Sequence, residues 1–242
     1  MKNWMWSGFV FIITFAIILF FNIPAIAIYL IVIPVLIFIF IQGSFMYSFR
    51  ESLSPVEIPS RGYEQRIKEN ERCMSGLPHG FKLIDRFYLK AIPDSITYAF
   101  IQESEPVICC IYNFGSKQAA DFVTIYNDGF TLTTNDTLDG GMAPRPEKNF
   151  VQLFPGQNYE KLYNKHMESH IYLIDQGLRP LFVHGSEFRH HFMKEYRAQG
   201  DFIRKIPFWT FILLFRTVTK YGKKYTIPLK RQVEDGITRI FR

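Results

Sequence analysis

The chain has 242 residues, of which 48% are hydrophobic, and it carries a formal net charge of +6. Its three cysteines are too few for a disulfide framework, which argues against a small disulfide-stapled secreted domain. The sequence contains no glycine-rich phosphate loop, dinucleotide fingerprint, serine nucleophile elbow or paired CxxC zinc motif. The sequence therefore names no reaction.

The charge is distributed unevenly along the chain. Lys2 is the only charged residue before Gly43, and residues 43–178 carry 13 Lys+Arg against 17 Asp+Glu. From Arg179 to the end the counts are 14 and 5, a balance of +9. A basic segment of this sign favours phosphate-bearing partners, and for a membrane-tethered chain the nearest phosphates belong to lipid headgroups.

Residues 4–41 are almost entirely apolar and contain no charge. A helix needs about 20 apolar residues to cross a bilayer, so this stretch predicts two spans, over about 4–21 and 25–41. Residues 1–43 would then form a transmembrane hairpin with a tight turn at Asn22-Ile23-Pro24. The alternative is a signal peptide cleaved near Ala25-Ile26-Ala27, which would leave a segment too short for a span.

The charges that flank the two spans predict their orientation. The turn between them is uncharged, whereas Lys2 precedes the first span and Arg50, Arg61 and Arg66 follow the second. Excess Lys and Arg remain on the cytoplasmic side of a membrane. We therefore expect a two-span protein of the cell inner membrane, with its N-terminus and its soluble domain in the cytoplasm. Unpaired cysteines suit that reducing compartment.

The remainder of the chain predicts a linker and one α+β domain. Residues 44–80 are polar and read as a linker with a short helix over 63–73, and residues 81–242 form the domain. Asn127-Asp128-Gly129 is a hairpin signal, and Cys109 and Cys110, as neighbours in a strand, should point to opposite faces. We expect an antiparallel meander of three to five strands, including Ile96–Gln102, Val107–Phe114, Asp121–Tyr126 and Phe130–Thr134.

Two helices are expected after the strands. Asn158 is a candidate N-cap for a helix that runs to Asp175 and stops at Gly177, and a second helix fits Ser186–Gln199, ended by Gly200. Strands followed by helices are typical of an α+β fold. The connecting segment Asn135–Asn149 has two glycines and two prolines, and it is either an exposed connector or a loop over a site.

His166 and His170 are the candidate site residues. Tyr159, Leu162, Tyr163, Met167, Leu173 and Ile174 share one face of the first predicted helix, and the two histidines fall in the middle of that face. Imidazoles at i and i+4 can ligate one metal such as zinc; the third ligand would come from His184, Asp128, Asp136 or a cysteine. The alternatives are a metal-free polar pocket, or core histidines hydrogen-bonded to backbone or to Thr and Asn side chains.

The segment 206–231 predicts a contact with the membrane. Ile206–Phe215 is nearly all apolar and includes Trp209, and it is followed by Arg216, Lys220, Lys223 and Lys224 without an acidic residue. An aromatic-apolar segment beside basic residues is typical of an interfacial element on an anionic leaflet. The alternative is a core helix with a basic end. Nucleic acid is not an expected partner, because no reader motif is present.

These patterns lead us to expect a non-catalytic, membrane-anchored cytoplasmic domain, without a cofactor, that works by contact with another protein. An accessory subunit of a membrane complex or an immunity-type protein would fit. One alternative is a membrane-tethered hydrolase that uses His166 and His170, with or without zinc. The other is a sensor of anionic lipid that binds through Trp209 and the basic residues after it.

Overall fold

The computed structural model describes residues 33–37, 55–56, 76–89, 95–114, 117–141, 143–206 and 209–240. The chain divides into two compact units, Met1–Tyr47 and Ser48–Arg242. In the first unit, residues 33–37 are helical. The rest of the two predicted spans and the predicted helix over 63–73 lie outside the described residues. Within the described residues, no helix combines the length and the apolar character needed to cross a bilayer.

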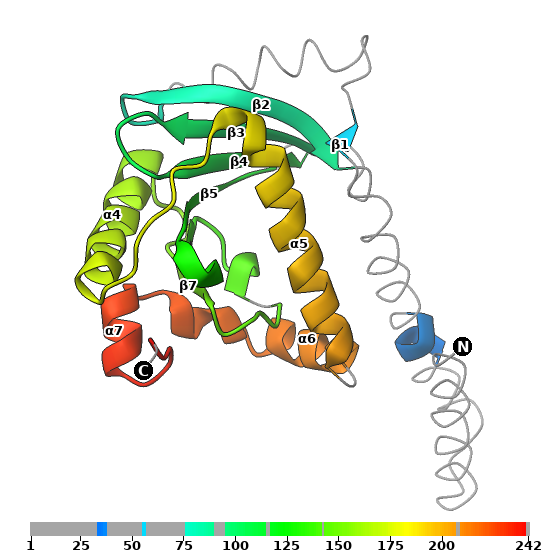
Figure 1. Cartoon of the computed structure of the whole chain (residues 1–242). Helices are drawn as coiled ribbons and strands as arrows, with labels where there is room; N and C mark the ends of the chain where they lie inside the picture. The colour runs from blue at the N-terminus through cyan, green and yellow to red at the C-terminus, as the bar shows by residue number, and fades with distance from the viewer. Residues whose placement is uncertain are drawn as a thin grey trace, which may run out of the picture. The chain divides into compact units, whose positions relative to one another are not determined.

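The second unit is an α+β domain with a seven-stranded sheet in its described part (Figure 1). The strands lie side by side in chain order; β1 to β6 pair antiparallel, and β7 pairs parallel with β6. Their bounds are β1 (Pro55–Val56), β2 (Phe81–Leu89), β3 (Ser95–Gln102), β4 (Ile108–Phe114), β5 (Lys117–Ile125), β6 (Thr131–Asn135) and β7 (Asn149–Leu153).

The four strands predicted from the sequence are β3, β4, β5 and β6, and their antiparallel meander is confirmed. The turn between β5 and β6 contains Gly129 with φ +76°, the conformation that favours glycine. Strands β2 and β7 were not expected. β2 carries charges and shifts register between Leu83 and Asp85, so its alternation is broken. β7 is only five residues long and follows a loop, so the alternation of apolar and polar residues that predicts a strand is too short to recognise there.

Helices cover both faces of the sheet. The helices are α4 (Tyr159–Asp175), α5 (Phe188–Lys205), α6 (Trp209–Val218) and α7 (Leu229–Glu234), with the 3-10 helices η2 (Asn127–Gly129), η3 (Asp139–Gly141), η4 (Gly185–Glu187) and η5 (Tyr221–Tyr225). One core cluster joins Leu162 of α4 to the face that holds Cys109, and another joins Phe188 of α5 to the face that holds Cys110. The expectation that the two thiols point to opposite faces is confirmed.

Helix α4 agrees with the prediction at both ends. The side chain of Asn158 accepts a hydrogen bond from the backbone N–H of Lys161 at 2.9 Å, which caps the first turn. The helix ends at Asp175, and Gly177 follows with φ +92°. The predicted apolar face is wrong at Ile174, which is 43% exposed; Ser169, which was not assigned to that face, is buried.

Helix α5 differs from the prediction at both ends. It begins at Phe188 without a side-chain cap and continues through Gly200 to Lys205. Ile203, one turn beyond Gly200, is buried, so burial of the last turn outweighs the helix-breaking tendency of the glycine. Arg189 forms a two-bond ion pair with Asp85 of β2, at 2.5 and 2.7 Å. This pair and the aromatic contacts hold α5 on the sheet.

Candidate functional site

His166 and His170 lie side by side on the buried face of α4, against β5 and β6. His166 has no exposed surface and His170 has 2%. Their positions on α4 follow from the helical period, because residues four apart lie on one face. The sequence therefore placed both imidazoles correctly in the interface between α4 and the sheet.

Both ring nitrogens of His166 have hydroxyl partners. Oγ1 of Thr124 on β5 lies 2.9 Å from Nε2, and Oγ1 of Thr134 on β6 lies 2.8 Å from Nδ1. A hydroxyl can donate or accept, so either tautomer of the neutral imidazole is satisfied. Burial, with a smaller contribution from the nearby His170, lowers the pKa of His166 to about 3. His166 is therefore a neutral residue near pH 7.

His170 forms a hydrogen bond with Tyr126, the residue that directly follows β5. Nδ1 of His170 lies 2.8 Å from the hydroxyl of Tyr126, whose ring is also fully buried. Burial lowers the pKa of His170, while the charge of Glu105 opposes that shift. The two histidines thus occupy hydrogen-bonding positions of the kind expected for core histidines with hydroxyl partners.

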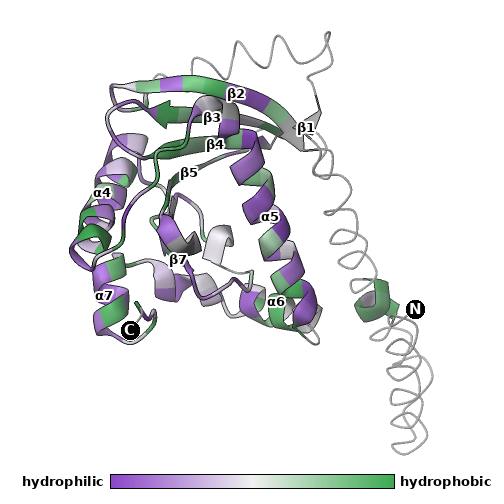
Figure 2. Cartoon of the chain, in the orientation of Figure 1, coloured by the Kyte–Doolittle hydropathy of each residue, from purple (hydrophilic) through white to green (hydrophobic). Residues whose placement is uncertain are grey.

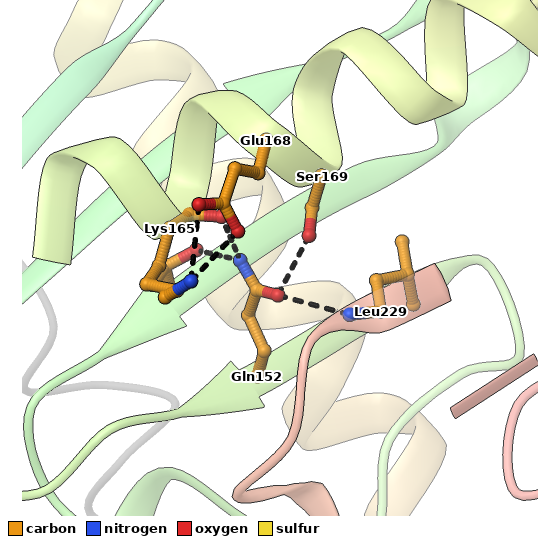
Figure 3. A network of polar contacts seen from close by, with 6 residues as sticks. Gln152, Lys165, Glu168, Ser169 and Leu229 are labelled. Carbon is orange, nitrogen blue, oxygen red and sulfur yellow. Dashed lines mark hydrogen bonds and ion pairs between the residues drawn. The ribbon is translucent and has the colours of Figure 1, made fainter. Parts of the chain in front are cut away.

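Gln152 of β7 extends the same network to α7 (Figure 3). Its Nε2 donates to Oγ1 of Thr134 at 2.7 Å and to the backbone oxygen of Lys165 at 3.0 Å. Its Oε1 accepts from Oγ of Ser169 at 2.8 Å and from the backbone N–H of Leu229 at 3.1 Å. Two donor hydrogens and two acceptor lone pairs are the full capacity of an amide. Buried Gln152 therefore joins β6, β7, α4 and α7.

The other candidate ligands come from other elements. His184 is exposed at the N-cap position of η4, where its side chain makes no cap hydrogen bond, and Asp128 is a residue of η2. Asp136 is partly buried, and its carboxylate accepts a hydrogen bond from the backbone N–H of Ala120 at 2.9 Å. Glu168 faces outward and pairs with Lys165. Among the residues that the structure describes, no three His, Cys, Asp or Glu side chains come together as a metal site.

A second group of polar side chains lies on the α5 face of the sheet, around Asp121. Cys110, Asp121 and Asn135 are register partners across β4, β5 and β6. Nδ2 of Asn135 donates to the Asp121 carboxylate, and Tyr112 also bonds to it. Burial raises the pKa of Asp121 to about 7, although the hydrogen bonds and the charge of Arg145 act in the opposite direction. Asp121 therefore titrates near neutral pH.

The predicted membrane-contact segment forms α6 and η5. Trp209 is partly buried at the start of α6, whereas Phe215 and Val218 at its end are 64% and 73% exposed. The apolar character of α6 contrasts with the many polar residues of α5 (Figure 2). Lys220 and Lys223, which follow, are exposed. The segment thus presents large apolar side chains beside positive charge.

Three cations and two tyrosines gather where η5 meets α6 and the loop before β7. We call this group the cation–tyrosine cluster: Arg145, Arg216, Tyr221, Lys224 and Tyr225. Arg216 lies over the ring of Tyr221 at 4.4 Å, and Lys224 lies 4.0 Å from the same ring. Arg145 lies 5.9 Å from the ring of Tyr225. Cations over aromatic faces are attracted by the ring quadrupole, so the side chains stabilise one another's positions.

Sequence reasoning missed Asp121, Gln152, Arg145 and the two tyrosines as parts of these groups. The position of Asp121 could have been noticed in the sequence, because residues two apart in a strand share a face and Asp121 therefore shares one with Val123 and Ile125. A charged residue at an inward position of a strand is unusual. Arg145 stands between two prolines, which restrict the backbone on either side of it. Gln152 had no comparable signal.

Comparison with protein-family models, with curated proteins and with solved structures finds no match to this chain.

Proposed function

We propose that this chain is a membrane-anchored, non-enzymatic interaction protein whose soluble unit docks on an anionic lipid surface through α6 and η5. The observation that carries the proposal is the exposure of Phe215 and Val218 next to Lys220 and Lys223. Apolar side chains can enter the interfacial layer of a bilayer while basic side chains meet lipid phosphates. We place this surface on the cytoplasmic leaflet of the cell inner membrane.

The histidine network supports a non-enzymatic function. His166 is fully buried and has hydroxyl partners at both ring nitrogens. A general base or a metal ligand needs a nitrogen lone pair directed at its substrate or ion. Here the nitrogens are engaged within the core, and Gln152 continues the network to α7. Such a network fixes the packing of helices on a sheet.

The apolar N-terminal stretch supports the membrane location. Residues 4–41 contain no charge, and the basic residues that follow them predict a cytoplasmic domain. A tethered domain needs little additional affinity to remain on the surface, because the tether makes docking effectively intramolecular. About 1 kcal/mol for each Lys or Arg near an anionic surface would then suffice.

Photo-crosslinking from position 215 tests the proposal. The full chain, with Phe215 replaced by p-benzoylphenylalanine, is reconstituted into nanodiscs of phosphatidylcholine with or without phosphatidylglycerol. We expect a lipid adduct in the anionic discs that decreases in neutral discs and at high salt, because salt screens exposed charges. Mass spectrometry of the irradiated protein measures the adduct.

The matched control carries the same analogue at Ile171, an apolar residue of α4 that is 55% exposed. An adduct yield at position 215 no greater than at position 171 would contradict lipid docking. A protein adduct at 215 in intact membranes, without a lipid adduct, would instead identify the surface as a contact with a protein partner.

A further inference from the structure

Two helices of the domain expose large apolar side chains three residues apart. Ile171 and Ile174 of α4 are 55% and 43% exposed, and Phe215 and Val218 of α6 are 64% and 73% exposed. Residues three apart on a helix are neighbours, so each pair forms one continuous apolar strip. Among the described residues of α4, α5, α6 and α7, no other large apolar side chain is exposed. The proposed lipid docking accounts for the strip on α6 and leaves the strip on α4 without an occupant.

The segment that follows α4 extends its apolar strip. Pro180 pairs with Tyr126, whose hydroxyl is hydrogen-bonded to His170 of α4. The segment therefore passes beside the C-terminal half of α4, and its Phe182 is 61% exposed. Figure 2 shows the end of α4 and this segment as hydrophobic. We call the three exposed apolar side chains the α4 patch: Ile171, Ile174 and Phe182.

The charged residues closest to the strip on α4 are acidic. Glu168 and Asp175 lie within about 60° of Ile171 around the helix axis. Lys161 and Lys165 lie farther around, at about 80° and 120°. Glu168 is paired with Lys165, whereas Asp175 is exposed at the end of the helix. The α4 patch therefore has an acidic border.

The strip on α6 has a border of the opposite charge. Lys220 and Lys223 follow the strip and are exposed, and residues 216–231 contain no acidic residue. A partner that fits the α4 patch offers apolar side chains at helical spacing with basic residues beside them. The end of α6 has both features. Figure 1 shows α4 and α6 on opposite sides of the domain, so the two strips of one copy do not meet.

We propose that the α4 patch of one copy of this chain binds the exposed end of α6 of a second copy. The isoleucines of α4 pack between the apolar side chains of α6, as ridges into grooves, and Asp175 faces Lys220 and Lys223. Two such contacts related by a twofold axis close a dimer. A small contact suffices for copies anchored in one membrane, because anchoring raises their effective concentration. The inference goes beyond the proposed lipid docking and does not rest on it.

Photo-crosslinking between two forms of the full chain tests the contact. One form carries p-benzoylphenylalanine in place of Phe215, and the other is labelled with heavy isotopes. The two forms are mixed in proteoliposomes of phosphatidylcholine alone, so that no anionic lipid competes for α6. We expect an adduct between the two forms that mass spectrometry locates in residues 166–189 of the labelled form, the tryptic peptide that contains the α4 patch. No adduct between the forms, or an adduct located elsewhere, would overturn the proposal.

Charge reversal separates a specific contact from simple crowding. Glu168→Lys with Asp175→Lys in the labelled form should lower the adduct yield at least about tenfold, because like charges then face each other. Lys220→Glu with Lys223→Glu in the crosslinking form should lower it to the same extent. Mixing the two altered forms restores opposite charges across the contact and should restore the adduct.

The matched control is Glu187→Lys with Asp201→Lys in the labelled form, at exposed positions and with the same change of net charge. Asp201 pairs with Arg204 as Glu168 does with Lys165. The control should retain the adduct, and circular dichroism verifies the folding of each variant. An equal loss in the control, or no recovery when the two altered forms are mixed, would overturn the contact. Changes on α4 leave the lipid adduct at position 215 intact, so the two proposals fail separately.

Discussion

At the scale of single residues, the network around His166 and Gln152 buries polar side chains that hydrogen-bond to one another. Both ring nitrogens of His166 form hydrogen bonds with threonine hydroxyls from two strands. Gln152 uses its full hydrogen-bonding capacity. An unsatisfied buried polar group costs about 1–3 kcal/mol. Without His166 the Thr124 hydroxyl would lose this partner, whereas the Thr134 hydroxyl would keep the hydrogen bond from Gln152.

Replacing His166 by Gln should destabilise the fold by about 1–3 kcal/mol at pH 7, because an amide cannot reach both hydroxyls with the geometry of an imidazole. The native pKa of about 3 lies below the usual value of about 6.5. Between these two pKa values the unfolded chain binds a proton at His166 and the native state does not. The stability of the wild type therefore falls as the pH drops below 6.5, by on the order of 3 kcal/mol at pH 4. Urea unfolding at pH 7 and pH 4 measures both effects.

The His166→Gln variant should lose less stability than the wild type between those two pH values. His190→Gln, at an exposed position of α5, is the control and should follow the wild type. A variant with the wild-type pH dependence would contradict the assignment of a buried neutral imidazole.

Asp121 should have the opposite pH dependence. Its native pKa of about 7 lies above the usual value of about 3.9. Between these values the native state holds a proton that the unfolded state has lost, so stability decreases as the pH rises from about 4 to about 7. Asp121→Asn removes the titration. The free energy of unfolding of the variant minus that of the wild type should be larger at pH 8 than at pH 5. Urea unfolding measures this difference, and an equal difference at both pH values would contradict the prediction.

At the scale of elements, the sheet and its helices depend on short connections that pack closely. The sequence left two interpretations of Asn135–Asn149, an exposed connector or a loop over a site. In the structure it contributes η3, packs its glycine against η5 and carries Arg145. The 3-10 helix η5 in turn contacts α6, η3 and β7. The loop is therefore part of the packing that arranges the cation–tyrosine cluster.

Gly222→Ala should destabilise this junction by about 1–3 kcal/mol, because the new methyl group would meet the backbone oxygen of Leu138 at 2.7 Å. Backbone on both sides leaves no flexible side chain to move aside. The thermal unfolding midpoint of the full chain measures the loss. Gly76→Ala is the control, since its nearest neighbour would be a Tyr159 ring carbon at 3.7 Å, an ordinary contact. Equal midpoints for the two variants would show that the junction is not tightly packed.

At the scale of the whole molecule, charge and apolar surface are separated along the chain. Residues 4–41 are almost entirely apolar, the middle is mildly acidic and the end is basic. The basic end contains the helix α6 with its exposed Phe215. This order places the proposed anchor near the start of the sequence and the proposed docking surface near its end, after the sheet, α4 and α5.

The double variant Lys220→Gln, Lys223→Gln should lose most of the lipid adduct formed from position 215 in anionic nanodiscs. Each exposed lysine contributes about 1 kcal/mol to attraction toward an anionic surface, and the two changes leave the buried core untouched. Lys161→Gln with Lys194→Gln, exposed on α4 and α5, keeps the same net charge and should retain the adduct. An equal loss in both double variants would indicate that net charge alone governs docking.

Much of the local structure could be predicted because local physics determines it. The cap at Asn158 and the glycine at 177 mark the ends of α4, and alternating β-branched and aromatic residues mark β3 to β6. The end of α5 could not be predicted from Gly200, because burial of Ile203 against the rest of the domain decides it.

The sequence by itself determined the α+β class, the four central strands, α4 and the inward direction of His166 and His170, since periodicity and caps act over a few residues. The tertiary structure alone decided what those side chains meet. It paired His166 with Thr124 and Thr134, bonded Asp136 to the backbone of Ala120, and brought Arg145 and Lys224 to the ring of Tyr225. Such contacts join residues tens of positions apart, and their geometry is set by strand register and helix packing, which no local pattern specifies.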